Sequence, residues 1–139
     1  DASNTNRMKV VKKYNTLLFL LSISITLISF VFVFFTHEII FKVFVAASFN
    51  EISYLLPYVV LAAGFFATGH IITIYQLSQI SSKHLLFPKI FTSIIGLVLN
   101  IFCAYLWGIK GIIFALIIYS LIYLLWMILI TYLVKDNEN

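Results

Sequence analysis

Four long stretches of this chain contain no Asp, Glu, Lys or Arg, and they limit the possible folds severely. They span residues 14–37, 52–82, 90–109 and 111–134. A bilayer core about 30 Å thick is crossed by roughly 20 helical residues. Backbone polar groups in lipid must bond within their own segment, which an α-helix achieves. The sequence therefore predicts an all-α, polytopic membrane protein with four transmembrane helices.

The composition leaves no room for a soluble catalytic domain. The 139 residues are 63% hydrophobic and 10% charged, whereas soluble domains carry about 25% charged residues. The chain begins with Asp1, and Met8 is the first methionine. We expect a piece of a longer protein without its N-terminal helices, and the alternative is a start at Met8.

Basic residues are distributed unevenly between the two sides that four spans would create. Short loops rich in Lys and Arg stay cytoplasmic. One side would hold seven basic residues and the other only Lys42 and Lys110, which predicts that both termini are cytoplasmic. The seven are Arg7, Lys9, Lys12, Lys13, Lys83, Lys89 and Lys135.

A short apolar segment follows the first predicted helix and is interrupted by Lys42. It is too short to cross, so we expect a short interfacial helix in the outer leaflet. The expected segments are a cytoplasmic basic segment 1–13, a transmembrane helix 14–37, an outer interfacial segment 38–50, a transmembrane helix 51–80, a cytoplasmic loop 81–88, a transmembrane helix 89–107, an outer turn 108–111, a transmembrane helix 112–134 and a cytoplasmic tail 135–139.

The first predicted helix carries hydroxyl side chains on one face. Ser22, Thr26 and Ser29 are spaced by four and three residues, so they lie on the same side of a helix. Helices in membranes pack through small and hydroxyl side chains. These residues either pack against a neighbouring helix or line a cavity.

The second predicted helix contains residues that permit bending or close packing and one ionisable side chain. Pro57 can kink it near the outer end. Gly64 and Thr68 form a pair that permits close helix approach. His70 lies well inside the span, where an ionisable group suggests proton relay or pH sensing. The alternative is a neutral histidine hydrogen-bonded to a neighbouring helix.

The third and fourth predicted helices should form an antiparallel hairpin. Gly108 and Gly111 flank a short connection that suits a tight turn. Asn100 lies in mid-span, where an unpaired amide costs several kcal/mol. We expect its partner to be a hydroxyl of another helix, or else water or a polar substrate in a cavity.

Several kinds of chemistry lack their sequence signals. There is no phosphate-binding GxxxxGK[ST] motif and no paired carboxylates. The three histidines have no metal-ligand spacing, and Cys103 is the only cysteine, which excludes an intrachain disulfide. The basic residues are too dispersed for nucleic-acid binding. We therefore expect no enzyme activity, no catalytic residue, no cofactor, no metal and no nucleic-acid partner.

The last two helices carry a pattern that resembles polysaccharide exporters of the O-antigen flippase type. These belong to the multidrug/oligosaccharidyl-lipid/polysaccharide export superfamily, which includes the MATE transporters. In the family a helix ends in Leu-Asn, an outer turn follows, and Gly-x-x-Gly begins a helix with small residues. Ile112, after the second glycine, departs from the usual small residue. The matching positions are Leu99, Asn100, Gly108, Gly111, Ala115 and Ser120.

The resemblance implies a function as well as a fold. The chain would be the last four of about twelve helices, and its basic first segment, residues 39–49 and Tyr54–Pro57 look like the family's ninth-to-tenth helix region. Such proteins flip lipid-linked oligosaccharides, the repeat units of O-antigen, capsule or exopolysaccharide, across the bacterial cytoplasmic membrane by alternating access. Implied partners are the bilayer, the preceding helices of the same protein and the lipid-linked glycan. The alternatives are a complete small four-helix subunit for polyprenol-sugar translocation, or a membrane anchor or assembly subunit without transport.

Overall fold

The computed structural model describes residues 2–45, 47–79 and 82–136, and helices account for nearly all of them. In chain order these are α1 (Ala2–Phe44), the 3-10 helix η1 (Ala47–Leu55), α2 (Leu56–Gln79) and α3 (Ser82–Asp136). No strand occurs in these three ranges. The predicted all-α class is therefore confirmed. Five parts of the expected segments lie outside the described residues: residue 1 of the basic segment, residue 46 of the interfacial segment, residue 80 of the second transmembrane helix, residue 81 of the loop and residues 137–139 of the tail.

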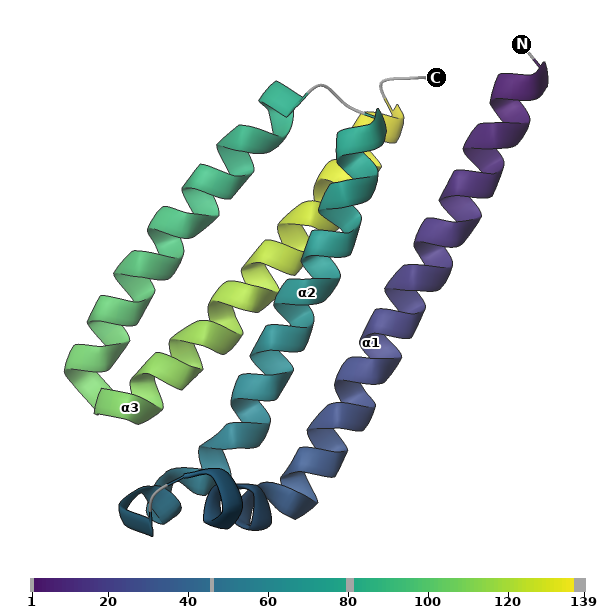
Figure 1. The fold of residues 1–139 in the computed structure, drawn as a ribbon. Helices are drawn as coiled ribbons and strands as arrows, with labels where there is room; N and C mark the ends of the chain where they lie inside the picture. The colour runs from purple at the N-terminus through teal and green to yellow at the C-terminus, as the bar shows by residue number, and fades with distance from the viewer. Residues whose placement is uncertain (1, 46, 80–81, 137–139) are drawn as a thin grey trace.

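Three helices in the described ranges are long and apolar enough to cross a membrane, where the sequence predicts four spans. They cover Lys13–Phe44, Phe49–Leu77 and Lys89–Thr131. The difference arises in α3, which contains both of the last two predicted spans. Figure 1 shows that α3 folds back on itself, so that its two limbs run in opposite directions.

A single residue reverses the direction of α3. Gly108 has φ 60° and ψ −137°, a backbone conformation outside the helical region that is essentially restricted to glycine. Three residues later the limbs approach so closely that a Cβ atom on Gly111 would collide with the carbonyl oxygen of Cys103. The expected turn 108–111 is thus concentrated at one position, and residues 109–111 already belong to the second limb.

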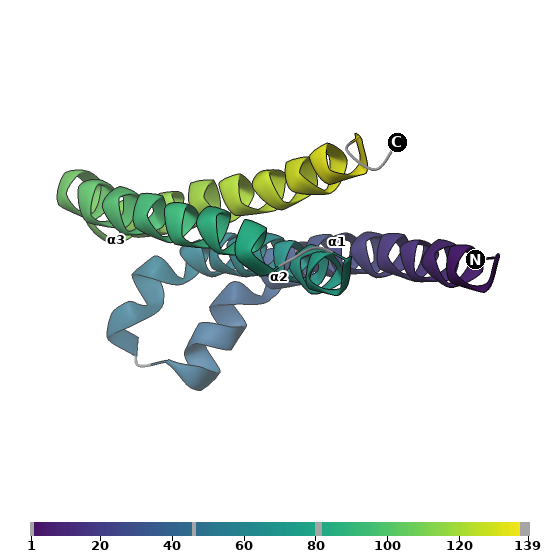
Figure 2. The ribbon, with the colours of Figure 1, turned by 90° about the horizontal axis from the view of Figure 1, so that it is seen from above.

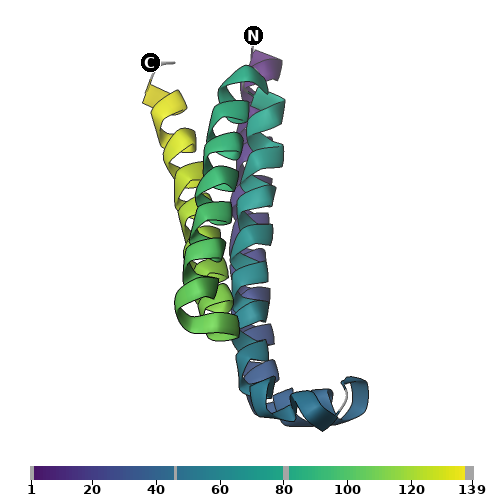
Figure 3. The same ribbon diagram turned by 90° about the vertical axis from the view of Figure 1, so that its left-hand side faces the viewer.

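The first helix is much longer than the sequence predicts. α1 continues through both expected boundaries, at residues 13/14 and 37/38, and ends at Phe44. The physical reason is that no glycine or proline occurs before Pro57, and a polar pair such as His37-Glu38 does not stop a helix. η1 then covers Ala47–Leu55, so the expected segment 38–50 is divided between α1 and η1. In Figure 3 this dark-blue region projects sideways from the long helices.

α2 lies at the centre of the molecule, with α1 on one side and α3 on the other. Seen from above, the two limbs of α3 form a layer over α1 and α2 (Figure 2). The core consists of Ile72 from α2 with Tyr123, Leu124 and Met127 from the second limb of α3. The start of α1, the end of α2 and both ends of α3 lie at one end of the molecule, whereas η1 and the reversal of α3 lie at the other (Figure 1).

Candidate functional site

An open groove runs along the contact between α1 and α2. It has a volume of ≈ 400 Å³, and the structure brings four of the predicted site residues to it: Ser22, Thr26 and Ser29 from α1, and Gly64 from α2. The remaining lining residues are apolar: Leu18, Leu21, Ile25, Val60, Ala67 and Ile71. The groove therefore presents an aliphatic wall with a line of hydroxyl groups.

Hydrogen bonds occupy most of these hydroxyl groups. Thr68 Oγ1 donates to the carbonyl oxygen of Gly64 at 2.8 Å and lies 2.7 Å from Ser22 Oγ. Because the single hydroxyl hydrogen of Thr68 is used, Ser22 is the donor of the bond between the helices. Thr26 Oγ1 donates to Ser22 O at 2.8 Å. Among the described residues only Ser29 brings a hydroxyl without a hydrogen-bond partner to the groove.

Close backbone approach, as well as hydrogen bonding, joins α1 to α2. A Cβ atom placed on Gly64 would collide with the side chain of Thr26. Thr26 and Thr68 are both buried, at 5% and 0% exposure. This is the small-residue contact that the Gly64–Thr68 spacing predicts, and it fixes the depth of the groove.

Pro57 does not kink α2. It is a buried residue in the first turn, because α2 begins at Leu56. The missing N–H of proline costs nothing there, since the first helical residues have no intrahelical acceptor. The predicted kink at Pro57 is therefore replaced by a helix start.

His70 is exposed on α2 and makes ring contacts with its neighbours. Its ring centroid lies 4.6 Å from that of Phe66, edge to face, and 5.4 Å from that of Tyr123 on α3. Within the described part of the chain it has neither a hydrogen bond nor an ion pair. The expected hydrogen bond to another helix is therefore not present, and His70 lies outside the groove lining.

Asn100 donates an amide hydrogen within its own helix. Its Nδ2 donates to the carbonyl oxygen of Gly96, one turn earlier, at 2.8 Å. Among the described residues the predicted bond to a hydroxyl of another helix does not occur, and the asparagine side chain reaches the preceding turn of α3. Gly96 itself packs against Tyr119, whose ring atom Cδ2 would lie 2.6 Å from an added Cβ.

The predicted residues thus fall into separate regions. The α1–α2 contact gathers those on α1 with Gly64 and Thr68, whereas Pro57, Gly108 and Gly111 lie at a helix start or at the reversal of α3. His70 and Asn100 are isolated from these groups and from each other. In the described part of the chain no three His, Cys, Asp or Glu side chains come together as metal ligands would.

The sequence interpretation missed a buried polar network between α2 and α3. Gln76 is 1% exposed, and its Nε2 donates to Met127 O and to Thr131 Oγ1, both at 2.8 Å. Thr73 Oγ1 donates to Gly69 O at 3.0 Å and lies 2.9 Å from the hydroxyl of Tyr123. Thr73 and Gln76 are three residues apart within an apolar span, which was the available signal. The Oε1 atom of Gln76 is buried without a partner.

Comparison with protein-family models, curated proteins and solved structures finds no match to this chain. The geometry of the α1–α2 groove and the sequence pattern therefore carry the functional argument.

Proposed function

We propose that the chain crosses the membrane four times, with both ends in the cytoplasm. The span Lys89–Thr131 has 43 residues, and a straight helix of that length would extend about 65 Å, roughly twice a bilayer core. Reversal at Gly108 gives each limb a length that suits one crossing. The uneven distribution of Lys and Arg supports placing the start of α1 and both ends of α3 on the cytoplasmic side.

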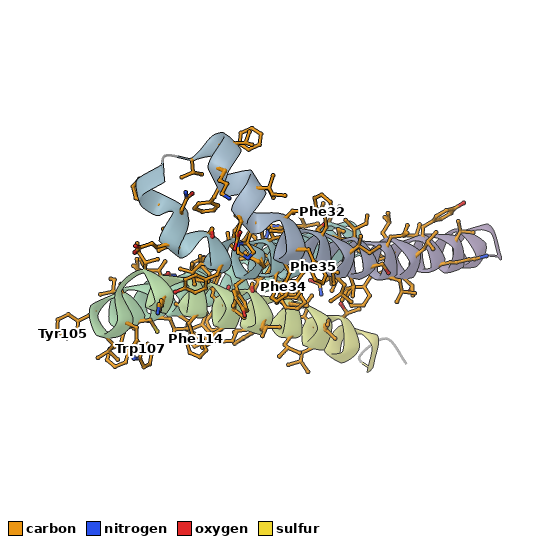
Figure 4. The ribbon with its side chains drawn as sticks, turned by 90° about the horizontal axis from the view of Figure 1, so that it is seen from below. Phe32, Phe34, Phe35, Tyr105, Trp107 and Phe114 are labelled. Carbon is orange, nitrogen blue, oxygen red and sulfur yellow. The ribbon has the colours of Figure 1, made fainter. Side chains whose placement is uncertain are left out.

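Exposed aromatic side chains beside the reversal of α3 support placing this part of the molecule at a membrane–water interface. Figure 4 shows Tyr105, Trp107 and Phe114 pointing away from the helices there. Their exposures are 88%, 59% and 52%. Tyr and Trp concentrate at membrane–water interfaces, where one edge of the ring is apolar and the other wet. This end of the molecule would lie at the outer surface.

We infer further that the chain serves a transporter that flips lipid-linked oligosaccharide across the bacterial cytoplasmic membrane by alternating access. The groove between α1 and α2 carries this proposal, because its aliphatic wall suits a polyprenyl chain and its hydroxyls suit a polar group. The resemblance at Asn100, Gly108 and Gly111 supports the same assignment.

The packing of α1 supports further helices as partners. In the most apolar 18-residue stretch of the span Lys13–Phe44, only 6% of the residues are buried. The corresponding values are 33% for Phe49–Leu77 and 28% for Lys89–Thr131. Lipid alone could cover this surface, but a helix in a two-lobed transporter would contact other helices of the same protein. We propose that preceding helices of the longer protein cover part of α1.

A non-transporting assembly subunit is the second candidate. It is favoured by the internal bonding of the groove, where only Ser29 keeps an unbonded hydroxyl among the described residues. A groove with so few free polar groups is suited to receiving another helix, as membrane interfaces do.

Cysteine labelling tests the proposed topology. Lys13 and Lys110 are both exposed and would face opposite compartments. In a Cys103→Ala background, Lys110→Cys should react with an impermeant maleimide added to intact cells, and Lys13→Cys should react only after the membrane is opened. Equal labelling of both variants in intact cells would contradict four crossings.

Transport in proteoliposomes tests the function. Protein reconstituted with a fluorescent polyprenyl-diphosphate oligosaccharide should move it to the opposite leaflet, where a membrane-impermeant quencher reports it. Ser29→Phe, which fills the groove, should slow this roughly tenfold, or about 1.4 kcal/mol of barrier. Ser24→Phe is the matched control, because Ser24 is exposed on α1 outside the groove lining.

The two candidates give different outcomes in this experiment. If the unmodified protein moves no glycan lipid, the transporter proposal fails. If Ser29→Phe instead prevents co-purification with other membrane helices, the assembly subunit is supported. Equal transport by the Ser29 and Ser24 variants would remove the groove from the substrate path.

A further inference from the structure

A polar pocket lies at the end of α1, beside η1 and far from the groove. It has a volume of ≈ 320 Å³ and is lined by Glu38, Lys42, Asn50, Glu51 and Ser53. Figure 4 looks toward this end of the molecule, where the end of α1 and η1 run side by side. The charged lining residues Glu38, Lys42 and Glu51 belong to the segment that projects sideways from the long helices.

The charged groups of the pocket have no ionic partners. Glu38 and Lys42 are one helical turn apart, a spacing that often produces an ion pair. In the described part of the chain, however, neither they nor Glu51 form an ion pair. Two carboxylates and one ammonium group therefore remain available to a bound molecule that carries both signs of charge.

The uncharged polar residues anchor one side of the pocket and leave one hydrogen-bond acceptor without a donor. Ser53 is 6% exposed and lies 3.1 Å, Oγ to Nδ1, from His37 on α1. This contact holds η1 against α1. The Oδ1 atom of Asn50 is buried without a hydrogen-bond donor, and a buried acceptor left unpaired is costly. Rotation of the Asn50 amide toward the pocket, together with a donor from a bound molecule, would relieve this cost.

Exposed apolar side chains adjoin the pocket on α1. Ile39 and Val43 directly follow Glu38 and Lys42 in the sequence and are 63% and 69% exposed. A ligand with a zwitterionic head and hydrocarbon chains would match both the pocket and this neighbouring surface. A free zwitterion would leave the apolar surface uncovered, which favours a lipid.

We propose that this pocket binds the headgroup of a phosphatidylethanolamine-type lipid. The primary ammonium has three N–H donors, which suit the carboxylates of Glu38 and Glu51 and the Oδ1 atom of Asn50. Lys42 takes the phosphate as a charge-assisted partner. A choline headgroup has no N–H donor and is therefore disfavoured. This site is independent of the transport proposal and requires only that the chain lies in a membrane.

Native mass spectrometry of the full chain in mild detergent tests the site. Phosphatidylethanolamine should bind roughly tenfold more tightly than phosphatidylcholine with the same acyl chains, as expected for lost charge-assisted hydrogen bonds. The double variant Glu38→Gln/Glu51→Gln should lose this preference. Asp136→Asn, at the opposite end of the molecule, is the matched control and should keep it.

Two further variants separate the parts of the site. Lys42→Met should weaken both lipids alike, because both carry a phosphate, and Asn50→Leu should weaken only the ethanolamine lipid. Free phosphoethanolamine at millimolar concentration should displace the bound lipid. Far-UV circular dichroism confirms that each variant remains helical. Equal binding of the two lipids by the unmodified protein, or an unchanged preference in the double glutamine variant, would overturn the proposal.

Discussion

The two sides of α2 are built in different ways. Toward α3 it buries Ile72, Thr73 and Gln76, at 5%, 2% and 1% exposure, against a continuous core. Toward α1 it offers Gly64 and Thr68, and the contact leaves an open groove of ≈ 400 Å³. One interface is closed by bulky and polar side chains, and the other is a small-residue contact beside an open groove.

This difference predicts which contact separates first. In lipid the hydrophobic effect does not hold helices together, so packing and hydrogen bonds supply the stability. The α2–α3 contact has three bonds between Thr73 or Gln76 and side-chain or backbone oxygens of α3. Toward α1, the Gly64–Thr68 contact contributes the Ser22–Thr68 bond. We expect α2 and α3 to behave as one unit, and α1 to move relative to it.

Truncation of the α2–α3 core should have the largest effect. Met127 is 0% exposed and packs with Ile72 and Tyr123. Met127→Ala should lower the free energy of unfolding by about 2–3 kcal/mol, the lower part of the range for buried residues in water, because the lost methylenes are apolar in lipid too. Steric-trapping measurements in micelles would report it.

The matched variant for this prediction lies on α1. Ile28 is 69% exposed, and Ile28→Ala should cost less than about 0.5 kcal/mol. Similar losses for the two variants would show that α1 is packed as firmly as the α2–α3 core, which would contradict the proposed difference.

An added side chain at Gly64 should separate α1 selectively. Gly64→Val introduces a collision with Thr26, and overpacking of this kind costs about 1–2 kcal/mol. Disulfide formation between Ser22→Cys and Thr68→Cys, in a Cys103→Ala background, should fall roughly tenfold. Ala63→Val is the control, because Ala63 is exposed on the same helix and lies outside the groove lining.

A glycine variant on the opposite side of α2 tests the α2–α3 contact in the same way. An added Cβ on Gly69 would lie 2.7 Å from the ring of Tyr123 on α3. Gly69→Val should therefore destabilise the α2–α3 contact and leave the Ser22–Thr68 cross-link intact. If both glycine variants abolish the cross-link, α1 and α3 do not act independently on α2.

The sequence predicts the helices well because apolar length and the absence of charge are local properties. It also places the reversal of α3 near Gly108, since glycine tolerates a backbone conformation that other residues avoid. The end of α1 could not be found in the same way. His37 and Glu38 suggest a boundary by their polarity, but α1 continues through them to Phe44, because neither residue breaks a helix as glycine or proline does.

How well the sequence predicts the role of a polar side chain depends on where its bonding partners lie in the chain. Ser22, Thr26 and Ser29 share a face by spacing alone, and the structure places them on one groove. Asn100 can bond either its own preceding turn or another helix, and local sequence does not distinguish these. Gln76 depends on Met127 and Thr131, more than 50 residues away, so only the packed structure identifies its role.

Removal of single hydrogen bonds should give the smallest effects and still rank the two interfaces. Thr73→Val leaves the hydroxyl of buried Tyr123 without its acceptor and should cost about 1 kcal/mol, within the range for interhelical bonds in membranes. Ser22→Ala removes a part-buried bond and should cost about 0.5 kcal/mol. A double-mutant cycle of Thr73→Val with Tyr123→Phe isolates the first bond, because both variants preserve side-chain shape. A coupling energy near zero for this pair, or a larger loss for Ser22→Ala than for Thr73→Val, would mean that the polar network does not distinguish the α3 side of α2 from its α1 side.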